Sequence, residues 1–422
     1  MKLLLFAGAG TSIELGVPAM TGLAREFLAH VKQWDIEPVL VHQIMGDRLD
    51  VETFIEEIDL VCEARGPLER LGHVEADFFA AFQAVRSEVE WFVQHAAERV
   101  SPRSATLLWG STLQASGRHD VTFVTTNYDR AIELAAHAED VRLVDGFQEL
   151  RTRETAPWGG FIKGSSDPLL VKMHGSTDWY AEQETGDPVK LRHPMPLFGK
   201  AELTLPNGSS LGSALVLPSR EKLLNRAPYP LLAQAFLNAK DECDGAVFVG
   251  TSLRDVHVRD AAKAIAVDRP VLVVNPEGDA FGIPGAVGVA EYASQFLIST
   301  LPKVLLQDDP LAALQRLRTK ETEEKAEGVL EYLEIAMDTL ESRERRCFAI
   351  EVLDQRLRWA PESIVSQLLG DEDATVARYA LGLVVSAHDR QTLLQRAREC
   401  AHAEDTEFAE EVVLLERILA QT

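Results

Sequence analysis

The sequence has little cysteine. Only four of its 422 residues are cysteine, and Cys62, Cys243, Cys347 and Cys400 stand too far apart to form any C-x-x-C pair. This spacing fits neither a disulfide framework nor a four-thiolate zinc site, whose ligands usually come in close pairs. We therefore expect reduced, mostly buried thiols and no zinc.

Positive charge is also scarce. The chain has 42 Lys and Arg residues against 66 Asp and Glu residues, which gives a formal net charge of −24. Proteins bind nucleic acids mainly through Lys and Arg contacts with phosphate, so direct nucleic-acid binding is not expected.

Long hydrophobic runs are missing as well. The apolar run after Met1-Lys2 reaches glycine within a few residues, which suits a strand and not a secretory signal. No stretch approaches the roughly 18 apolar residues of a membrane span. We expect a soluble, cytoplasmic protein without membrane contact.

Two common nucleotide-binding fingerprints are absent. There is no G-x-x-x-x-G-K-[ST] loop, which excludes a P-loop ATPase. The dehydrogenase pattern G-x-G-x-x-G fails because the next glycine after Gly8 and Gly10 is Gly16. No clear second strand ends in an acidic residue about 20 positions further on.

What the sequence does have is a set of apolar strands that end in polar loops. The first, at 3–7, leads directly into Gly8, Ala9, Gly10, Thr11 and Ser12. Doubly wound α/β domains present backbone N–H groups to a pyrophosphate in this way. The same pattern recurs three times, and the polar residues that follow those strands include Asn127, Asp129, His174, Gly250, Thr251 and Ser252.

These strand ends are expected to meet, because ligands of open parallel sheets bind beyond the carboxyl ends of the strands. The glycine loops would offer backbone donors and hydroxyls to a pyrophosphate. Asn127 and Asp129 would add an amide and a carboxylate. His174 is the one group among them that titrates near neutrality, which suits a general base. The ligand implied is a dinucleotide.

The order of the segments predicts an α/β fold, a Rossmann-like doubly wound parallel sheet with a helical insertion and a C-terminal all-α region. Further strands are predicted at 121–125, 141–144, 169–173, 214–217, 246–249 and 271–274, several of them continuous apolar runs. The helical insertion covers about 20–116, where stripes such as Phe54, Ile58 and Phe82, Val85, Val89 have helical spacing.

Two other regions have distinct compositions. The stretch 177–213 is rich in glycine and proline and predicts an irregular excursion, either a lid or a small embedded module. After Pro310, short amphipathic helices without a clear repeat run to the end. We predict a catalytic domain at 1–306 and a helical assembly region at 307–422.

The polar strand ends, in their order, resemble the motifs of the sirtuin (SIR2) family. Gly8–Ser12 with Gly16-Val17-Pro18 resembles its opening motif, and Thr126–Asp129 resembles its Gln-Asn-Ile-Asp motif. His174-Gly175 resembles the catalytic His-Gly, and Gly250–Leu253 resembles Gly-Thr-Ser-Leu. Asn275 stands where the family has an Asn that contacts the adenosine ribose. Leu301-Pro302-Lys303-Val304 resembles the last core helix.

The resemblance implies that NAD+ is the substrate. Asn127 would orient water and ribose hydroxyls, Asp129 would hold the nicotinamide carboxamide, and His174 would accept a proton. The residues implied to bind the dinucleotide are Gly8, Ala9, Gly10, Thr11, Ser12, Gly250, Thr251, Ser252 and Asn275.

Two departures from the family pattern favour hydrolysis over transfer to acyl-lysine. Protein-deacylating sirtuins carry a four-cysteine zinc module after the His-Gly, whereas 177–214 has no cysteine. Where the family continues Asp-Phe-Arg, this chain has Ala19-Met20-Thr21, without the Phe thought to shield the reactive sugar carbon from water. The combination resembles bacterial SIR2-like NAD-hydrolysing effectors of antiphage defence. That implies a homo-oligomer and a partner protein, such as a DNA-translocating ATPase or an Argonaute-type protein.

Plainer explanations stay open for single residues. Asn127 could cap the helix that follows it, and Gly8 and Gly10 could serve only a tight turn. Ser176 and Asp178 near His174 could suggest a hydrolase triad, but no G-x-S-x-G elbow accompanies them. The sequence predicts an NAD+ glycohydrolase that yields nicotinamide and ADP-ribose. The alternatives are an NAD-dependent protein deacylase and a non-catalytic NAD or ADP-ribose-binding module.

Overall fold

Six parallel strands form the central sheet of the computed structural model, which describes residues 1–18, 20–31, 54–55, 58, 60–61, 76–148, 155–161, 167–192, 203–204, 208, 210–215, 227–317, 329–357, 360–387, 389–400, 402–403 and 405–419. The sheet order is β11-β10-β9-β1-β2-β4. In chain order the strands are β1 (Lys2–Ala7), β2 (Asp120–Thr125), β4 (Leu169–Lys172), β9 (Gly245–Val249), β10 (Val271–Asn275) and β11 (Ala286–Ala290).

The sheet is doubly wound. From β1 the chain adds β2 and β4 on one side, then crosses to add β9, β10 and β11 on the other, and every neighbouring pair is parallel. The predicted Rossmann-like fold is confirmed. The strand order reverses between β1 and β9, which places the switch point at the loops that follow these two strands.

Both faces of the sheet are buried. Leu3, Leu5 and Ala7 of β1 share one core with α6 (Pro102–Ser116) and α7 (Ala131–Ala138). Leu4 and Phe6 of the same strand share the opposite core with α8 (Tyr229–Glu242) and α9 (Val256–Ala266). Side chains alternate across a strand, so a strand covered on both faces must be apolar throughout.

Two predicted strands are wrong in detail. The segment 141–144 contributes only an isolated bridge, between Val144 and Leu169. Strand β8 (Ser210–Ser213) ends before Ala214, and Val216 and Leu217 lie outside the described residues. The sixth strand is instead β11, which the sequence did not indicate. It lies at the sheet edge, is only partly buried, and its sequence Ala-Val-Gly-Val-Ala carries a central glycine, which weakens the strand pattern.

The glycine- and proline-rich stretch contributes to a small module. Five antiparallel strands form a second sheet in the order β3-β6-β5-β8-β7. They are β3 (Thr155–Pro157), β5 (Trp179–Glu182), β6 (Pro188–Leu191), β7 (Leu203–Thr204) and β8. Strands of two to four residues are too short to show the alternating pattern that identifies a strand in a sequence.

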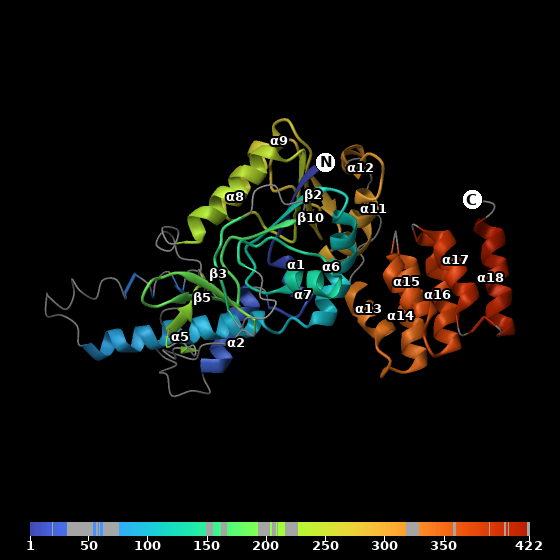
Figure 1. The fold of residues 1–422 in the computed structure, drawn as a ribbon, viewed down its shortest axis with the longest axis horizontal. Helices are drawn as coiled ribbons and strands as arrows, with labels where there is room; N and C mark the ends of the chain where they lie inside the picture. The colour runs from blue at the N-terminus through green and yellow to red at the C-terminus, as the bar shows by residue number, and fades with distance from the viewer. Residues whose placement is uncertain are drawn as a thin grey trace.

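The short α1 (Gly10–Ile13) precedes the predicted helical insertion, and the insertion itself begins with α2 (Met20–Val31) and includes α5 (Ala76–Ala97). These two helices have a core of their own, which includes Phe27, Phe54, Ile58, Phe82 and Phe92. Helix α6, by contrast, packs on the sheet. In Figure 1 the long α5 lies at the end of the molecule opposite α18.

The chain leaves the sheet through α10 (Ala293–Gln295), the π-helix η3 (Phe296–Thr300), α11 (Leu301–Leu305) and α12 (Pro310–Leu317). The remaining helices are α13 (Val329–Met337), α14 (Arg343–Arg356), α15 (Glu362–Leu369), α16 (Ala374–Ser386), α17 (Arg390–Glu399) and α18 (Thr406–Leu419). Helices α14–α18 stand side by side in Figure 1, and α13 packs against α6.

This helical array has a repeat that the sequence did not show. The side chains of Ser342, Asp373 and Asp405 accept backbone N–H groups at the starts of α14, α16 and α18, at intervals of about 31 residues. Regularly stacked helix pairs are typical of α-solenoids. None of the described helices combines the length and apolarity required to cross a bilayer.

Candidate active site

The loops after β1 and β9 pack directly against each other at the switch point. Gly8 N–H donates to the Val249 carbonyl at 2.9 Å, and Gly10 N–H donates to the Gly250 carbonyl at 2.7 Å. A Cβ on Gly8 would lie 2.6 Å from Thr251 Cβ, and one on Gly10 would lie 2.7 Å from Gly250 Cα. The glycines are therefore required by this close approach and not only by the turn.

Three backbone N–H groups of these loops are left over. The amides of residues 10–12 and of Gly250 donate to carbonyls within the protein. In the part of the chain that the structure describes, the amides of Ala9, Thr251 and Ser252 donate to no protein group. Ala9 and Ser252 are exposed. Free N–H groups on two facing loops can bind an anion.

The hydroxyls of Thr11 and Ser12 are bonded inside the protein. Thr11 Oγ1 donates to the Gly8 carbonyl at 2.8 Å, and Ser12 Oγ donates to Asp129 Oδ2 at 2.5 Å. Both residues are buried. The sequence predicted that these hydroxyls face a pyrophosphate, whereas the structure uses them to connect the first loop to the loop after β2.

Asn127 is anchored through its side-chain nitrogen. Its Nδ2 donates to the Gly8 carbonyl at 2.9 Å and to Thr11 Oγ1 at 3.0 Å. A backbone carbonyl can only accept, so the NH₂ group and not the oxygen must face Gly8. Among the described residues, Oδ1 has no hydrogen-bond partner. Half-buried Asn127 therefore presents an acceptor whose direction is fixed.

The side chain that bonds to the start of the following helix, α7, is that of Asp129 and not that of Asn127. Asp129 Oδ1 accepts the N–H of Ala131 at 2.9 Å, while Oδ2 accepts the Ser12 hydroxyl. The carboxylate is 6% exposed and held from two sides. The capping explanation for Asn127 is thus wrong, and the orientation of Asp129 is set by both loops.

His174 follows β4 and faces Tyr128, with ring centroids 6.2 Å apart. Burial lowers the pKa of His174 below its usual 6.5, and the Asp255 carboxylate acts in the opposite direction with a smaller effect. The imidazole is therefore neutral at neutral pH and able to accept a proton. The triad alternative finds no support, since Ser176 Oγ accepts Lys172 Nζ and Asp178 pairs with Lys190.

A pH profile tests this assignment of His174. If neutral His174 is required, activity should rise with pH along a single acidic limb centred below pH 6.5. Asp255→Asn removes the charge that raises the pKa of His174, so the limb should move to lower pH. The asparagine oxygen can still accept the N–H groups of His257 and Val258 that Asp255 caps. A limb that does not respond to Asp255→Asn would contradict the assignment.

Asn275 ends β10, at the same edge of the sheet. Its Oδ1 accepts the Asp279 N–H at 3.1 Å, and its Nδ2 donates to the Asp279 carbonyl at 2.8 Å. The structure thus brings Gly8–Ser12, Asn127, Asp129 and the Gly250 loop into direct contact. His174 joins them through the ring of Tyr128, and Asn275 closes its own loop.

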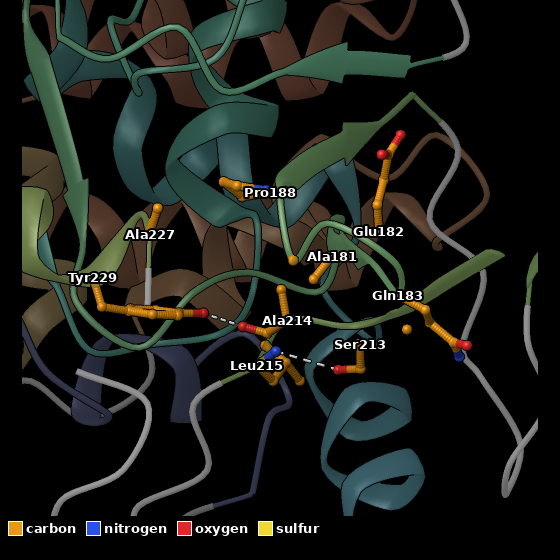
Figure 2. A pocket seen from close by; sticks show the side chains of 11 residues that line it. Ala181, Glu182, Gln183, Pro188, Ser213, Ala214, Leu215, Ala227 and Tyr229 are labelled. Carbon is orange, nitrogen blue, oxygen red and sulfur yellow. Dashed lines mark hydrogen bonds between the residues drawn. The ribbon is translucent and has the colours of Figure 1, made fainter. Parts of the chain in front are cut away.

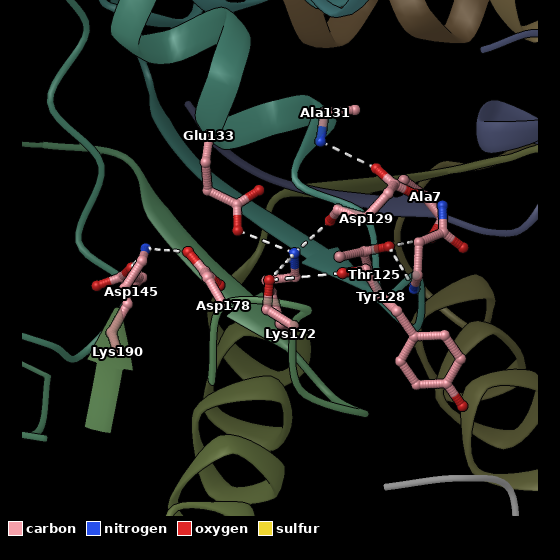
Figure 3. Close-up of polar contacts among 12 residues, drawn as sticks. Ala7, Thr125, Tyr128, Asp129, Ala131, Glu133, Asp145, Lys172, Asp178 and Lys190 are labelled. Carbon is pink, nitrogen blue, oxygen red and sulfur yellow. Dashed lines mark hydrogen bonds and ion pairs between the residues drawn. The ribbon is translucent and has the colours of Figure 1, made fainter. Parts of the chain in front are cut away.

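Two lysines, the buried Lys172 and the largely buried Lys190, were not identified from the sequence (Figure 3). Lys172 donates to the Asp129 carbonyl, and Lys190 Nζ lies 2.5 Å from Asp145 Oδ2 and 3.6 Å from Asp178 Oδ2. Burial acts to raise the pKa of Asp178, but Lys190, Lys172 and Arg130 hold it below its usual value. In the sequence, Lys172 could have been recognised by its position at the end of the otherwise apolar run 169–172.

A pocket of about 380 Å³ lies beside the small sheet (Figure 2). Its lining includes Glu182, Ser213, Ala214 and Tyr229, and none of the predicted site residues. The Tyr229 hydroxyl donates to the Ala214 carbonyl. A Cβ on Gly175 would lie 3.1 Å from that hydroxyl and 3.2 Å from the carbonyl, so the pocket wall backs onto the His174-Gly175 turn.

The described residues include no group of three or more His, Cys, Asp or Glu placed to hold a metal ion. Cys243 and Cys347 are buried free thiols, and Cys400 is a partly exposed one. Cys62 lies outside the described residues.

Residues 121–277 match the family model described as SIR2-like domain. This part of the chain is similar to SIR2-like domains. The matched segment includes Asn127, Asp129, His174, Gly250–Ser252 and Asn275. It extends from β2 to just beyond β10, and β1, which lies outside it, pairs with both β2 and β9 in the central sheet.

Solved structures similar to this chain are distant. A Sir2 homologue in complex with NAD is 13% identical, with 75% of this chain and 89% of the other covered and a TM-score of 0.37. A structure on the mechanism and regulation of Sir2 enzymes is 18% identical, covers 75% and 93%, and has a TM-score of 0.36. No curated protein matches the sequence significantly. The fold assignment rests on the strand order of the central sheet itself.

Proposed function

We propose that this protein hydrolyses NAD+ to nicotinamide and ADP-ribose. The observation that carries the proposal is Asn127, whose nitrogen is fixed by Gly8 and Thr11 and whose oxygen is left without a partner among the described residues. Such an oxygen can orient a water molecule at a defined position. The SIR2-like match and the neutral His174 point to the same chemistry.

The chemical demands of the reaction fit these residues. The nicotinamide of NAD+ carries a positive charge and is already a good leaving group, so no general acid is needed at that bond. The remaining tasks are to position the nucleophile and to accept a proton. Asn127 Oδ1 would accept a hydrogen bond from the attacking water or a ribose hydroxyl, and His174 would accept the proton.

The rest of the dinucleotide would be bound by the two loops and their neighbours. The free amides of Ala9, Thr251 and Ser252 would bind the pyrophosphate. Asp129 would hold the nicotinamide carboxamide with the lone pairs that Ser12 and Ala131 leave unused, and Asn275 would contact the adenosine ribose.

Hydrolysis is preferred over deacylation for two reasons in the sequence. The segment 177–214 has no cysteine with which to build the zinc module of protein-deacylating sirtuins, and Ala19-Met20-Thr21 replaces Asp-Phe-Arg. Water, and not an acyl-lysine, is then the acceptor that reaches the sugar carbon. The residues that would serve catalysis are retained, which disfavours a module that only binds the nucleotide.

The decisive measurement is nicotinamide release from NAD+ by the purified full chain, without peptide. His174→Ala should lower the rate by roughly 10²–10⁴-fold, since it removes the proton acceptor. The matched control is His257→Ala, an exposed histidine on α9, which should retain the parental rate. Release only when an acylated peptide is added would instead identify a deacylase. Absence of both release and NAD+ binding, measured by calorimetry, would refute the proposal.

We further propose a role in antiphage defence, with a homo-oligomer and a partner protein acting on the NAD+-hydrolysing site. Support comes from the helical array, where Phe348, Tyr379, Val413 and Leu414 are exposed apolar side chains on α14, α16 and α18. Cells with the parental chain should lose NAD+ during infection, and cells with His174→Ala should not. Equal NAD+ levels in the two infected cultures would exclude this role.

A further inference from the structure

Lys172 is a fully buried cation at the end of β4. Its side chain is about 1% exposed, and its ammonium donates three hydrogen bonds (Figure 3). The acceptors are the Asp129 carbonyl, Glu133 Oε1 at 2.9 Å and Ser176 Oγ at 2.9 Å. An ammonium has three N–H groups, so every donor of Lys172 is used.

The acceptors come from three different segments. Asp129 ends the loop that carries Asn127, Glu133 lies in the first turn of α7, and Ser176 belongs to the turn that carries His174. Lys172 is therefore the point at which the Asn127 loop and the His174 turn meet.

Backbone hydrogen bonds join the same two segments beside Lys172. Met173 N–H donates to the Thr125 carbonyl at 2.8 Å, and Thr177 N–H donates to the Tyr128 carbonyl at 3.0 Å. His174 lies between these two bonds in the chain and faces the Tyr128 ring. Its position relative to the Asn127 loop thus depends on how firmly the two segments are held together.

Because Lys172 is charged and buried, removing its ammonium group would also affect the stability of the protein. Glu133 provides the compensating carboxylate, at 2.9 Å. If the ammonium is removed alone, a largely buried carboxylate is left without its partner, which is strongly destabilising. If both charges are removed together, that penalty is avoided while the bonds to Asp129 and Ser176 are still lost. The two roles of Lys172, electrostatic and positional, can therefore be separated by mutation.

We infer that Lys172 is a positioning residue that holds the Asn127 loop and the His174 turn as one unit. The inference rests on the proposed function for the catalytic roles of Asn127 and His174, but the contacts that carry it do not depend on NAD+. A 1 Å displacement of a catalytic group can cost about 100-fold in rate. Loss of Lys172 should therefore reduce turnover more than it reduces substrate binding.

The test variant is Lys172→Met with Glu133→Gln, which keeps the length of both side chains and removes both charges. The control is Lys190→Met with Asp145→Asn, which removes the largely buried Lys190 and its 2.5 Å partner. Lys190 makes no bond to the Asn127 loop or to residues 173–176 in the part of the chain that the structure describes. Both double variants are compared with the parental full chain at matched temperature below their unfolding transitions.

Two readouts are needed. The first is hydrogen exchange of the Met173 and Thr177 amides without NAD+. Exchange should become at least roughly 10-fold faster in the Lys172 variant, and the core amides of β1 should keep their protection. The second is nicotinamide release, where kcat should fall about 100-fold while the Kd for NAD+ stays within roughly 3-fold. The Lys190 variant should match the parental chain in both.

Each possible result either supports or contradicts the positioning role of Lys172. Parental protection of Met173 and Thr177 in the Lys172 variant would overturn it, as would faster exchange with an unchanged kcat. A kcat loss without faster exchange would also overturn it, because Lys172 would then act by another route. If the parental chain releases no nicotinamide, the exchange measurement alone decides whether Lys172 holds the two segments together, and the proposed function fails if NAD+ binding is absent as well.

Discussion

Asn127→Ala should lower nicotinamide release by about 10²–10³-fold with little loss of stability. The large effect on rate follows from the unpartnered Oδ1, which is the acceptor proposed to orient water. The small effect on stability follows from the Gly8 carbonyl. That carbonyl keeps the Thr11 N–H at 3.0 Å and the Thr11 hydroxyl at 2.8 Å when Asn127 is truncated. The loss should be on the order of 1 kcal/mol.

The measurement combines steady-state nicotinamide release with thermal unfolding. Asn238→Ala is the matched control, because Asn238 is exposed on α8 and, among the described residues, its side chain bonds only to the Gln234 amide one turn earlier. It should leave rate and stability unchanged. An Asn127→Ala protein that is folded, binds NAD+ and turns over at the parental rate would remove Asn127 from the mechanism.

Gly250→Ala should lower the free energy of unfolding by about 3 kcal/mol or more, because it disrupts the packing at the switch point. Two costs add. Gly250 has a φ of +61°, which L-residues rarely adopt, and a Cβ would lie 2.7 Å from the Thr11 nitrogen and 2.9 Å from the Gly10 carbonyl carbon. These are backbone atoms that cannot rotate away. The facing loops would have to separate, and the free amides proposed to bind pyrophosphate would separate with them.

Substitutions at two other glycines separate the conformational cost of Gly250→Ala from its steric cost. Gly16 has a φ of +86° with open space around its Cβ position, so Gly16→Ala should show only the conformational cost, about 1–2 kcal/mol. Gly117 has a φ of −59° and an ordinary 3.5 Å contact, so Gly117→Ala should be neutral or slightly stabilising. Thermal unfolding should show the largest loss of stability for Gly250→Ala, a smaller loss for Gly16→Ala and none for Gly117→Ala. If Gly250→Ala were no worse than Gly16→Ala, the close packing of the two loops would be refuted.

Much of the sheet could be predicted because its strands are buried on both faces. Runs such as those at 246–249 and 271–274 contain no polar residue, and only a doubly covered strand requires this. The edge strand β11 and the short strands of the small sheet could not be predicted. A half-covered or very short strand leaves too few constrained positions to form a pattern.

The candidate site divides in the same way. Gly8, Asn127, His174 and Gly250 could be selected because each directly follows a recognisable strand. Their hydrogen bonds could not be predicted, since the partners are far apart in the chain. Ser12 reaches Asp129 across 117 positions, and Asn127 reaches Gly8 across 119.

The sequence by itself determined the parallel sheet, the residues at its carboxyl edge and their resemblance to the sirtuin motifs. Those properties depend on local order along the chain, such as an apolar run followed by a polar turn. Only the tertiary structure decided that β1 lies between β2 and β9, that Gly8 and Gly250 touch, and that Lys172 is buried beneath the Asn127 loop. Strand order decides which loops become neighbours. Burial then decides which polar groups must bond to one another and which, such as Asn127 Oδ1, remain for a ligand.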